Sequence, residues 1–290
     1  MTTGFDKLEG WIWINGEFVA WQDAKIHVMT HGLHYGGSVF EGIRLYNGKI
    51  FKLRDHMARL VRSAELIGAP ISQSLDELCT AVVQAVHKNN LKDGYIRPLA
   101  WRGPEEMGIG ATKCKTHVMV ACWPWEKYFG AAKGISIVTS QWKKADPETA
   151  VTESKCAALY VTNTLAKHEA IEKGYDDALM LDYRGYVAEI SAANIFIVKN
   201  GAVFTPIADC FLNGITRLTV MDLCRQNNIS IEETRISVEE LTNADEVFIT
   251  GTLAEVTPVI KIDDRNFEIG EMTQSLMRLY QIETGQYAIL

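Results

Sequence analysis

The chain has 290 residues, 47% of them hydrophobic, and a formal net charge of -7. This composition supports a substantial folded core and argues against an intrinsically disordered chain. The acidic balance argues against a nucleic-acid-binding protein, which needs clustered lysine and arginine.

The chain carries no visible signal for export or membrane insertion. Residues 1–6 lack the basic and apolar regions of a secretory signal, and no apolar run approaches membrane-spanning length. The six cysteines are scattered and no pair has CxxC spacing, which is typical of reduced thiols. We therefore predict a cytoplasmic protein that acts neither at a membrane nor on nucleic acid.

The first part of the chain predicts an α+β domain. Two apolar runs flank Asn15-Gly16, a strong hairpin signal, and a strand from Ser38 to Tyr46 meets a second such turn at Asn47-Gly48. A one-sided apolar pattern predicts a helix capped by Asp55 and ended by Gly68. A capping box at residues 74–77 begins a second helix. Further strands are expected at residues 95–101 and 117–123.

Residues 127–134 are predicted to be a linker between two domains. This gives a smaller N-terminal domain of residues 1–126 and a larger C-terminal domain of residues 135–290. Hairpins on both sides of the linker, rather than regular βαβ units, favour two α+β domains over a Rossmann or TIM-barrel fold. In the second domain we expect strands at residues 135–141, 178–182, 186–189, 194–199, 202–205 and 247–250, and helices at 160–173, 216–226, 237–243 and 273–280.

Lys155 lies in an unusually small and apolar stretch, followed by Cys156-Ala157-Ala158. Most lysines are exposed, and a surface position is the commoner alternative. Desolvation would instead lower the pKa of this amine and free it to attack an aldehyde. The same amine would then move a proton at the α-carbon of a substrate.

Glu189 and a glycine-led helix start suggest the rest of a cofactor site. Glu189 ends a predicted strand, where it is either exposed or buried and paired, for example with a protonated pyridine nitrogen. The amides of Ile215 and Thr216 would face a phosphate at a helix N-terminus. Gly251-Thr252 adds a hydroxyl, and Arg59 is either a bidentate phosphate donor or part of a solvated helix face. Together with Lys155, these residues predict a pyridoxal phosphate (PLP) site.

Two other groups of residues have simpler interpretations. His27, His31 and His34 have spacings that resemble metal ligands, but no cysteine or carboxylate completes the set, so no metal site is predicted. Trp123-Pro124-Trp125 and Tyr128 are either core residues or the wall of an apolar substrate pocket between domains.

The chain resembles the class IV (fold type IV) PLP-dependent aminotransferases, and most closely the branched-chain amino-acid aminotransferases. The resemblance rests on ordered motifs that cover nearly the whole chain. These motifs are His31 to Arg44, His56 to Leu60, Tyr95 to Leu99, the Lys155 region, Gly185 to Phe196, Gly214 to Arg217 and Gly251 to Pro258. It implies fold type IV, with two α+β domains and PLP at their interface.

The resemblance also implies a set of site residues, in which Lys155 carries the cofactor as a Schiff base and Glu189 pairs with its ring nitrogen. The other implied cofactor contacts are Arg59, Tyr160, Leu212, Ile215, Thr216 and Thr252. The implied substrate contacts are Tyr35, Phe40, Tyr95, Arg97, Trp125, Tyr128, Thr252 and Leu253. The chain departs from the family pattern at Ala157-Ala158, Leu159, Ser191-Ala192-Ala193, Asn213 and Leu253, which bears on substrate preference.

The implied activity is transfer of the amino group of Leu, Ile or Val to 2-oxoglutarate, as in branched-chain amino-acid biosynthesis. The partners are then small amino acids and 2-oxo acids. Because active sites of this family take a loop from a second subunit, a homodimer or a larger homo-oligomer such as a hexamer is expected. The alternatives are a class IV transaminase of D-amino acids or (R)-amines, a PLP lyase of the same fold, and a PLP-binding protein without transaminase activity.

Overall fold

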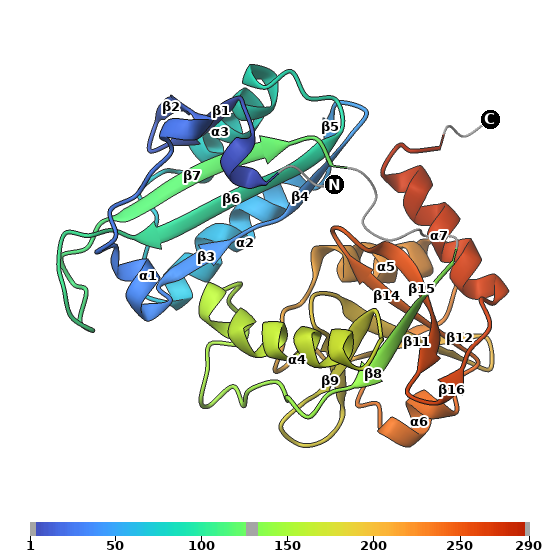
Figure 1. Ribbon diagram of the computed structural model, residues 1–290. Coiled ribbons are helices and arrows are strands. Elements are labelled where there is room, and N and C mark those ends of the chain that lie inside the picture. Colours follow the sequence, from blue (N-terminus) through green and yellow to red (C-terminus); the bar gives the residue numbers. More distant parts are fainter. Residues whose placement is uncertain (1–3, 126–132, 288–290) are drawn as a thin grey trace. The chain divides into compact units, whose positions relative to one another are not determined.

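The computed structural model describes residues 4–125 and 133–287, and the chain folds into two compact units (Figure 1). Unit 1 comprises Met1–Glu126 together with Ser154–Ala158, and unit 2 comprises Lys127–Glu153 together with Leu159–Leu290. The segment Ser154–Ala158 therefore groups with unit 1, whereas the sequence places it in a contiguous C-terminal domain. Cys156 forms a β-bridge with Val39, and the Phe40 N–H donates to the Lys155 carbonyl over 3.2 Å.

Unit 1 is built on one antiparallel sheet. Its strand order is β2-β1-β7-β6-β4-β5, with β3 also paired to β6. The strands are β1 (Trp11–Ile14), β2 (Glu17–Ala20), β3 (Ser38–Phe40), β4 (Ile43–Tyr46), β5 (Lys49–Ile50), β6 (Gly94–Arg102) and β7 (Thr116–Trp123). The Asn15-Gly16 and Asn47-Gly48 turns form as predicted, with positive φ at each residue.

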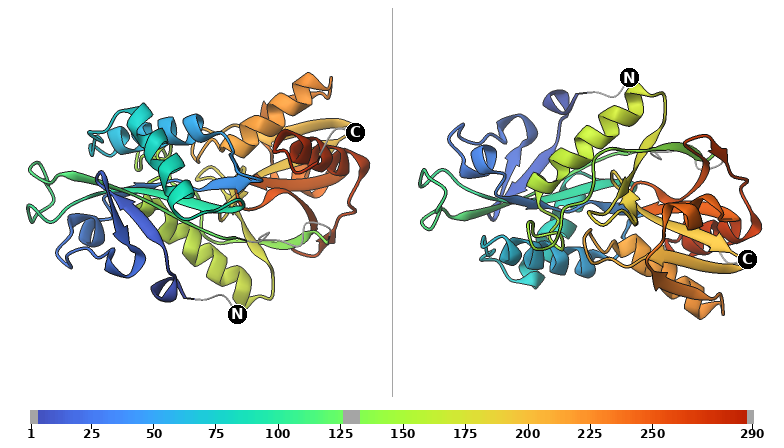
Figure 2. Two further views of the ribbon diagram at one scale, coloured as in Figure 1. Left: turned by 90° about the horizontal axis from the view of Figure 1, so that it is seen from above. Right: turned by 90° about the horizontal axis from the view of Figure 1, so that it is seen from below.

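Two helices, α2 (Leu53–Leu66) and α3 (Leu75–Lys88), pack against each other and against this sheet (Figure 2). The Ser74 capping box that begins α3 is confirmed, whereas the predicted cap at Asp55 is wrong. Asp55 lies inside the first turn of α2, and the chain enters that helix through Lys52 with φ 50°. A short helix, α1 (His31–Tyr35), and two 3-10 turns, η1 (Phe5–Lys7) and η2 (Trp21–Asp23), complete the described part of this unit.

The predicted strand from Ser38 to Tyr46 is interrupted at Glu41-Gly42, which separates β3 from β4. A Cβ atom at Gly42 would lie 1.9 Å from the Tyr95 hydroxyl, so only glycine fits at this point. The Glu41 N–H donates to the Pro98 carbonyl over 2.8 Å, and the Glu41 side chain is completely buried. The interruption thus directs the Glu41 carboxylate into the interior of unit 1.

Unit 2 contains the second sheet, with the order β10-β9-β8-β15-β14-β11-β12-β13 and β16 on β15. Since β10 pairs with both β9 and β11, six of these strands form a closed circuit. The strands are β8 (Ile135–Thr139), β9 (Asp177–Leu181), β10 (Val187–Ile190), β11 (Asn194–Lys199), β12 (Ala202–Pro206), β13 (Ile231–Thr234), β14 (Glu246–Gly251), β15 (Glu255–Ile262) and β16 (Arg265–Asn266).

Four helices of unit 2 surround this sheet. A 3-10 turn, η3 (Ala157–Leu159), leads into α4 (Tyr160–Glu172), which packs on β9, while α5 (Ile215–Gln226) and α7 (Glu271–Glu283) pack together over β14. The short helix α6 (Val238–Thr242) begins with the predicted Ser237 capping box. Alternating strand residues such as Ile195, Ile197 and Ile249 fill the core of the unit. Within residues 4–125 and 133–287, every helix is too short or too polar to cross a membrane.

Candidate active site

Lys155 is held in unit 1 by contacts with α2. Its backbone N–H donates to the Ser63 hydroxyl over 3.0 Å, and the Ser154 hydroxyl donates to the Ser63 carbonyl over the same distance. The Lys155 amine lies 4.9 Å from the centre of the Phe40 ring. Burial, with a further contribution from the nearby Arg59 guanidinium, lowers the pKa of this amine to about 8. A substantial fraction of the amine is therefore neutral near pH 8.

Arg59 is not part of a solvated helix face, because its side chain is only 16% exposed. Its Nε donates to Glu41 Oε1 over 2.7 Å and its Nη2 donates to Oε2 over 2.9 Å. His56 Nδ1 lies 2.7 Å from the same carboxylate. Although burial alone would raise the pKa of Glu41, Arg59 and His56 hold it well below its usual range. The carboxylate is therefore ionised and fixes the Arg59 guanidinium.

His56 is nearly completely buried, and this burial lowers its pKa even though Glu41 lies beside it. The ring is therefore neutral near pH 7. Since a carboxylate only accepts hydrogen bonds, the Nδ1 proton points at Glu41. Neither Glu41 nor His56 was singled out from the sequence. An acidic residue within an apolar strand and directly before a glycine is the signal that would have identified Glu41.

Phe40, Tyr95 and Arg97 form a second cluster in unit 1. Arg97 Nη2 donates to the Tyr95 hydroxyl over 3.0 Å, and the guanidinium carbon lies 4.7 Å from the Phe40 ring centre. Trp125 adds its ring 5.9 Å from that of Tyr95. Arg97 Nε is buried and has no hydrogen-bond partner within the described parts of the chain. A buried guanidinium donor of this kind suits an anionic ligand such as a carboxylate.

The remaining aromatic residues and histidines singled out from the sequence lie elsewhere or outside the described residues. Tyr35 is on α1, where it is exposed and its ring lies 4.7 Å from that of His31. Tyr128 lies outside the described residues. His31 Nε2 lies 3.1 Å from the Gly108 carbonyl, and His34 Nε2 lies 2.9 Å from the Val28 carbonyl. These two rings thus bond to the backbone of loops.

Glu189 lies on β10 of unit 2, where it is 7% exposed, so the buried alternative is the observed one. Its Oε1 forms an ion pair with Lys144 Nζ at 2.8 Å, and its Oε2 accepts a hydrogen bond from Asn194 over 3.1 Å. Lys144 also donates to Asn163 Oδ1 over 3.1 Å. The carboxylate is thus buried with polar partners on both oxygens, as its desolvation requires.

The N-terminus of α5 offers backbone amides to an anion. Gly214 is the N-cap and has no side chain to bond the first amides, while Ile215 and Thr216 are both buried. A Cβ atom at Gly214 would lie 2.1 Å from Asn194 Oδ1, so the turn is packed against that side chain. An uncapped, buried helix start of this kind is a ready site for a phosphate group.

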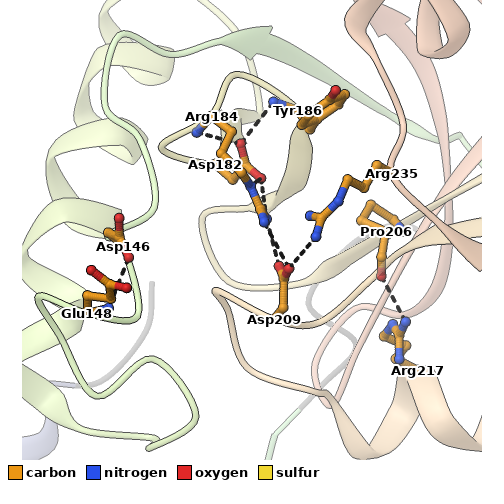
Figure 3. A network of polar contacts seen from close by, with 9 residues as sticks. All are labelled: Asp146, Glu148, Asp182, Arg184, Tyr186, Pro206, Asp209, Arg217 and Arg235. Atoms are coloured by element: carbon orange, nitrogen blue, oxygen red, sulfur yellow. Dashed lines mark hydrogen bonds and ion pairs between the residues drawn. The ribbon is translucent and has the colours of Figure 1, made fainter.

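Leu212 lies in the chain segment that leads into α5. Charged side chains anchor this segment (Figure 3). Arg184 donates to both Asp209 oxygens, over 2.8 and 3.0 Å, and Arg235 approaches Asp209 to 3.0 Å. Arg184, and to a smaller extent Arg235, lowers the pKa of Asp209 to about 2. The fully buried Arg217 donates to Asn213 Oδ1 and to the Pro206 carbonyl, each over 2.8 Å.

The other predicted residues of unit 2 flank these elements. Thr252 and Leu253 lie in the turn between β14 and β15, which follows the pairing of Thr250 with Asn194. Tyr160 is the first residue of α4. Unit 2 thus brings Glu189 and the start of α5 together around Asn194, while unit 1 brings together Lys155, Arg59 and Phe40.

These residues fit PLP. A desolvated amine, a buried ionisable carboxylate and an uncapped helix N-terminus match its aldehyde, its ring nitrogen and its phosphate. Arg97 and its buried Nε match the carboxylate of an amino-acid substrate.

Comparison with known proteins identifies the family. Residues 38–262 match the family Amino-transferase class IV. The chain belongs to the class IV aminotransferases. The branched-chain-amino-acid aminotransferase of Escherichia coli (strain K12) is 43% identical to this aminotransferase over 280 residues, 93% of this chain and 89% of that protein. The predicted family is therefore confirmed.

Solved structures of branched-chain aminotransferases have the same fold as this chain. The branched-chain aminotransferase of Thermoproteus uzoniensis, determined with norvaline, has a TM-score of 0.92 and 38% identity over 96% of each chain. The branched-chain amino acid aminotransferase of Thermobaculum terrenum, in its PLP form, has a TM-score of 0.87 and 30% identity over 96% of this chain and 95% of that one. The predicted α+β, fold type IV architecture is thus confirmed for this class IV aminotransferase.

Proposed function

We propose that this class IV aminotransferase uses PLP to transfer the amino group of Leu, Ile or Val to 2-oxoglutarate. The products are branched-chain 2-oxo acids and glutamate. The proposal is carried by the buried Lys155 amine, whose pKa is lowered to about 8, in a chain whose Escherichia coli relative is named for this activity. The norvaline held by the Thermoproteus uzoniensis relative, an apolar amino acid, adds support.

In this proposal the cofactor is held by the residues that the sequence predicted. Lys155 would be joined to it covalently, Glu189 would accept a hydrogen bond from its ring nitrogen, and Leu212 would pack on the ring. Tyr160 donates to its phenolic oxygen. The phosphate is bound by Arg59, by the amides of Ile215 and Thr216, and by Thr252. When bound, PLP supplies an electron sink for the negative charge that develops on the substrate α-carbon.

Lys155 is the catalytic acid and base. Because its pKa is lowered, the amine exchanges a proton readily near neutral pH, and it would move a proton from the substrate α-carbon to the C4′ carbon of PLP.

Substrate recognition is assigned to the aromatic cluster of unit 1 and to the β14–β15 turn. Arg97, whose Nε is buried without a partner in the described residues, binds a carboxylate together with Tyr95 and the backbone near Thr252 and Leu253. Phe40 provides apolar surface for the branched side chain. Tyr35, Trp125 and Tyr128 complete the proposed apolar pocket.

We also propose a homodimer or a larger homo-oligomer such as a hexamer. Support comes from exposed apolar side chains of unit 1: Ile109, Val28 and Leu33 are 86%, 73% and 63% exposed. An apolar cavity of about 260 Å³, lined by residues that include Ile26 and Leu33, opens in the same unit. A second copy of the chain is the partner that would cover this surface.

A cytoplasmic role in branched-chain amino-acid biosynthesis belongs to the same proposal. All six cysteines lie within the described residues, and none forms a disulfide. Burial raises the pKa of the Cys122 and Cys210 thiols to about 12, so neither is a reactive thiolate near neutral pH. Free, inert thiols are typical of proteins that work in a reducing compartment.

The decisive experiment is a donor screen with purified enzyme. L-leucine and 2-oxoglutarate should give one equivalent each of the 2-oxo acid and glutamate, faster than any D-amino acid or (R)-arylamine. Faster conversion of D-alanine or an (R)-amine would favour the first alternative. PLP binding without amino transfer would favour a lyase or a binding protein. Borohydride reduction followed by peptide mapping should place the cofactor on Lys155.

A further inference from the structure

Asn194 occupies a junction of unit 2, and the sequence motif that contains it, Gly185 to Phe196, assigned it no role. It is the first residue of β11 and is 5% exposed. It lies opposite Glu189 on β10, across the Ser191-Ala192-Ala193 turn, and opposite Thr250 on β14. The pair Glu189–Asn194 is the pairing between β10 and β11 that closes the circuit of six strands.

The orientation of the Asn194 amide is fixed by its neighbours. Its Nδ2 lies 3.1 Å from Glu189 Oε2 and 3.1 Å from the Leu212 carbonyl. Both partners are acceptors, so the NH2 group must face them, and its two hydrogens satisfy one partner each. A single buried side chain thus bonds the carboxylate and the segment that leads into α5.

The other end of the same amide meets the start of α5. With Nδ2 so placed, Oδ1 faces Gly214, where a Cβ atom would lie 2.1 Å away. The carbonyl oxygen of Asn194 therefore defines how closely the N-cap of α5 approaches β11. Glu189, Leu212 and Gly214 are consequently positioned by one residue that is itself anchored in two strand pairings.

We propose that Asn194 is a positioning residue that holds the carboxylate partner of the PLP ring nitrogen in register with the phosphate-binding turn. The proposal rests on the function proposed above. The distance between the ring nitrogen and the phosphate of PLP is fixed by the cofactor. Glu189 and Gly214 must therefore keep a matching separation, and the Asn194 amide spans the gap between them.

The substitution N194D is the sharpest test, because it keeps the shape of the side chain and removes the two N–H donors of its amide. A carboxylate at 194 would face Glu189 and the Leu212 carbonyl with acceptors only, and like charges would repel. The pKa of this aspartate should be raised by the repulsion, so that at lower pH it should be protonated and its O–H should donate to Glu189. Binding of PLP to N194D should therefore weaken as pH rises, relative to the wild type at each pH.

The experiment titrates apoenzyme with PLP and follows the visible absorbance from pH 6 to 9, for the wild type, N194A, N194D and N243A. Asn243 is exposed on the C-cap of α6 and provides the matched control for loss of an asparagine side chain. The PLP dissociation constant of N194A should rise about tenfold. That of N194D should rise further at high pH, and that of N243A should not change. Melting temperatures of each apoenzyme are measured alongside.

The outcomes separate three cases. Wild-type protein that binds PLP, with N194A and N194D binding equally well at every pH, overturns the role of Asn194 alone. Variants that lower the apoenzyme melting temperature, yet leave the dissociation constant and its pH dependence unchanged, assign Asn194 to stability only and also overturn it. Wild-type protein that binds no PLP overturns the proposed function together with this inference.

Discussion

Lys155 and Glu41 illustrate how burial decides ionisation at single residues. The pKa of Lys155 is lowered to about 8 because desolvation penalises the ammonium and Arg59 repels it, while Glu41 partly offsets both effects. The carboxylate of Glu41 is buried more deeply still but remains ionised, because Arg59 and His56 surround it. At Glu41 the partners at bonding distance outweigh the effect of burial on the pKa. At Lys155 the effect of burial is the larger one.

The first prediction concerns the reactivity of Lys155. In the apoenzyme its amine should react with an acylating reagent with a midpoint near pH 8, because the neutral form predominates only above its lowered pKa. The pKa of an ordinary lysine is 10.5. Mass spectrometry of peptides labelled between pH 6 and 11 measures this midpoint, with the exposed Lys113 as the internal control. A Lys155 midpoint equal to that of Lys113 would contradict the desolvated environment.

The second prediction concerns Glu41. E41Q removes a buried charge that Arg59 and His56 share, and it should lower the free energy of unfolding by about 3–5 kcal/mol near pH 7. Because the folded-state pKa is depressed below 4.5, the contribution of Glu41 is present above pH 4.5 and is lost as pH falls toward the folded pKa. Urea unfolding of both proteins at several pH values should show the difference shrinking in acid. A difference that is constant with pH would argue against an ionic role.

At the scale of elements, the start of α5 is the feature on which phosphate binding depends. G214A would bring a methyl group to 2.1 Å from Asn194 Oδ1 and should cost about 1–3 kcal/mol of stability. The PLP dissociation constant should rise because the amides of Ile215 and Thr216 move away from their positions. Gly110, which has open space around it, provides the control G110A. Equal PLP affinities for G214A and G110A would refute this requirement.

Local signals in the sequence predict much of the element order. Asn-Gly turns and the Ser74 and Ser237 capping boxes are short-range features, and each forms as predicted. The interruption at Glu41-Gly42 was not predictable, because its cause is the hydroxyl of Tyr95, more than fifty residues away. Likewise β13 and β15 were not predicted from the sequence, and their pairing with β12 and β14 identifies them.

The residues of the candidate site likewise divide into those that the sequence pointed to and those that it did not. Lys155, Glu189 and Gly214 were identified because their chemistry is unusual for their local context. Their supporting residues His56, Lys144 and Asn194 were missed, since the role of each depends on a partner that another segment supplies. Arg59 was ambiguous from the sequence for the same reason; its contact with Glu41 excludes the solvated helix face, and its role as a phosphate donor stays a prediction.

At the scale of the whole molecule, the exposed apolar loops of unit 1 predict self-association. I109E places a charge on a side chain that is 86% exposed, so it should leave the monomer folded but weaken the oligomer. Light scattering during gel filtration measures the mass of each species. Ile171, 59% exposed on α4, gives the control I171E, which should keep the wild-type mass. An I109E protein with unchanged mass at low concentration would exclude this loop from the interface.

The grouping of Ser154–Ala158 with unit 1 means that the polypeptide passes from one unit to the other three times. A gene fragment that ends at residue 126 would therefore encode unit 1 without the short piece that carries Lys155. When either half is exchanged between homologous enzymes, this pentapeptide has to be moved together with the N-terminal block. Otherwise Lys155 is separated from Ser63 and Phe40, the neighbours that orient it.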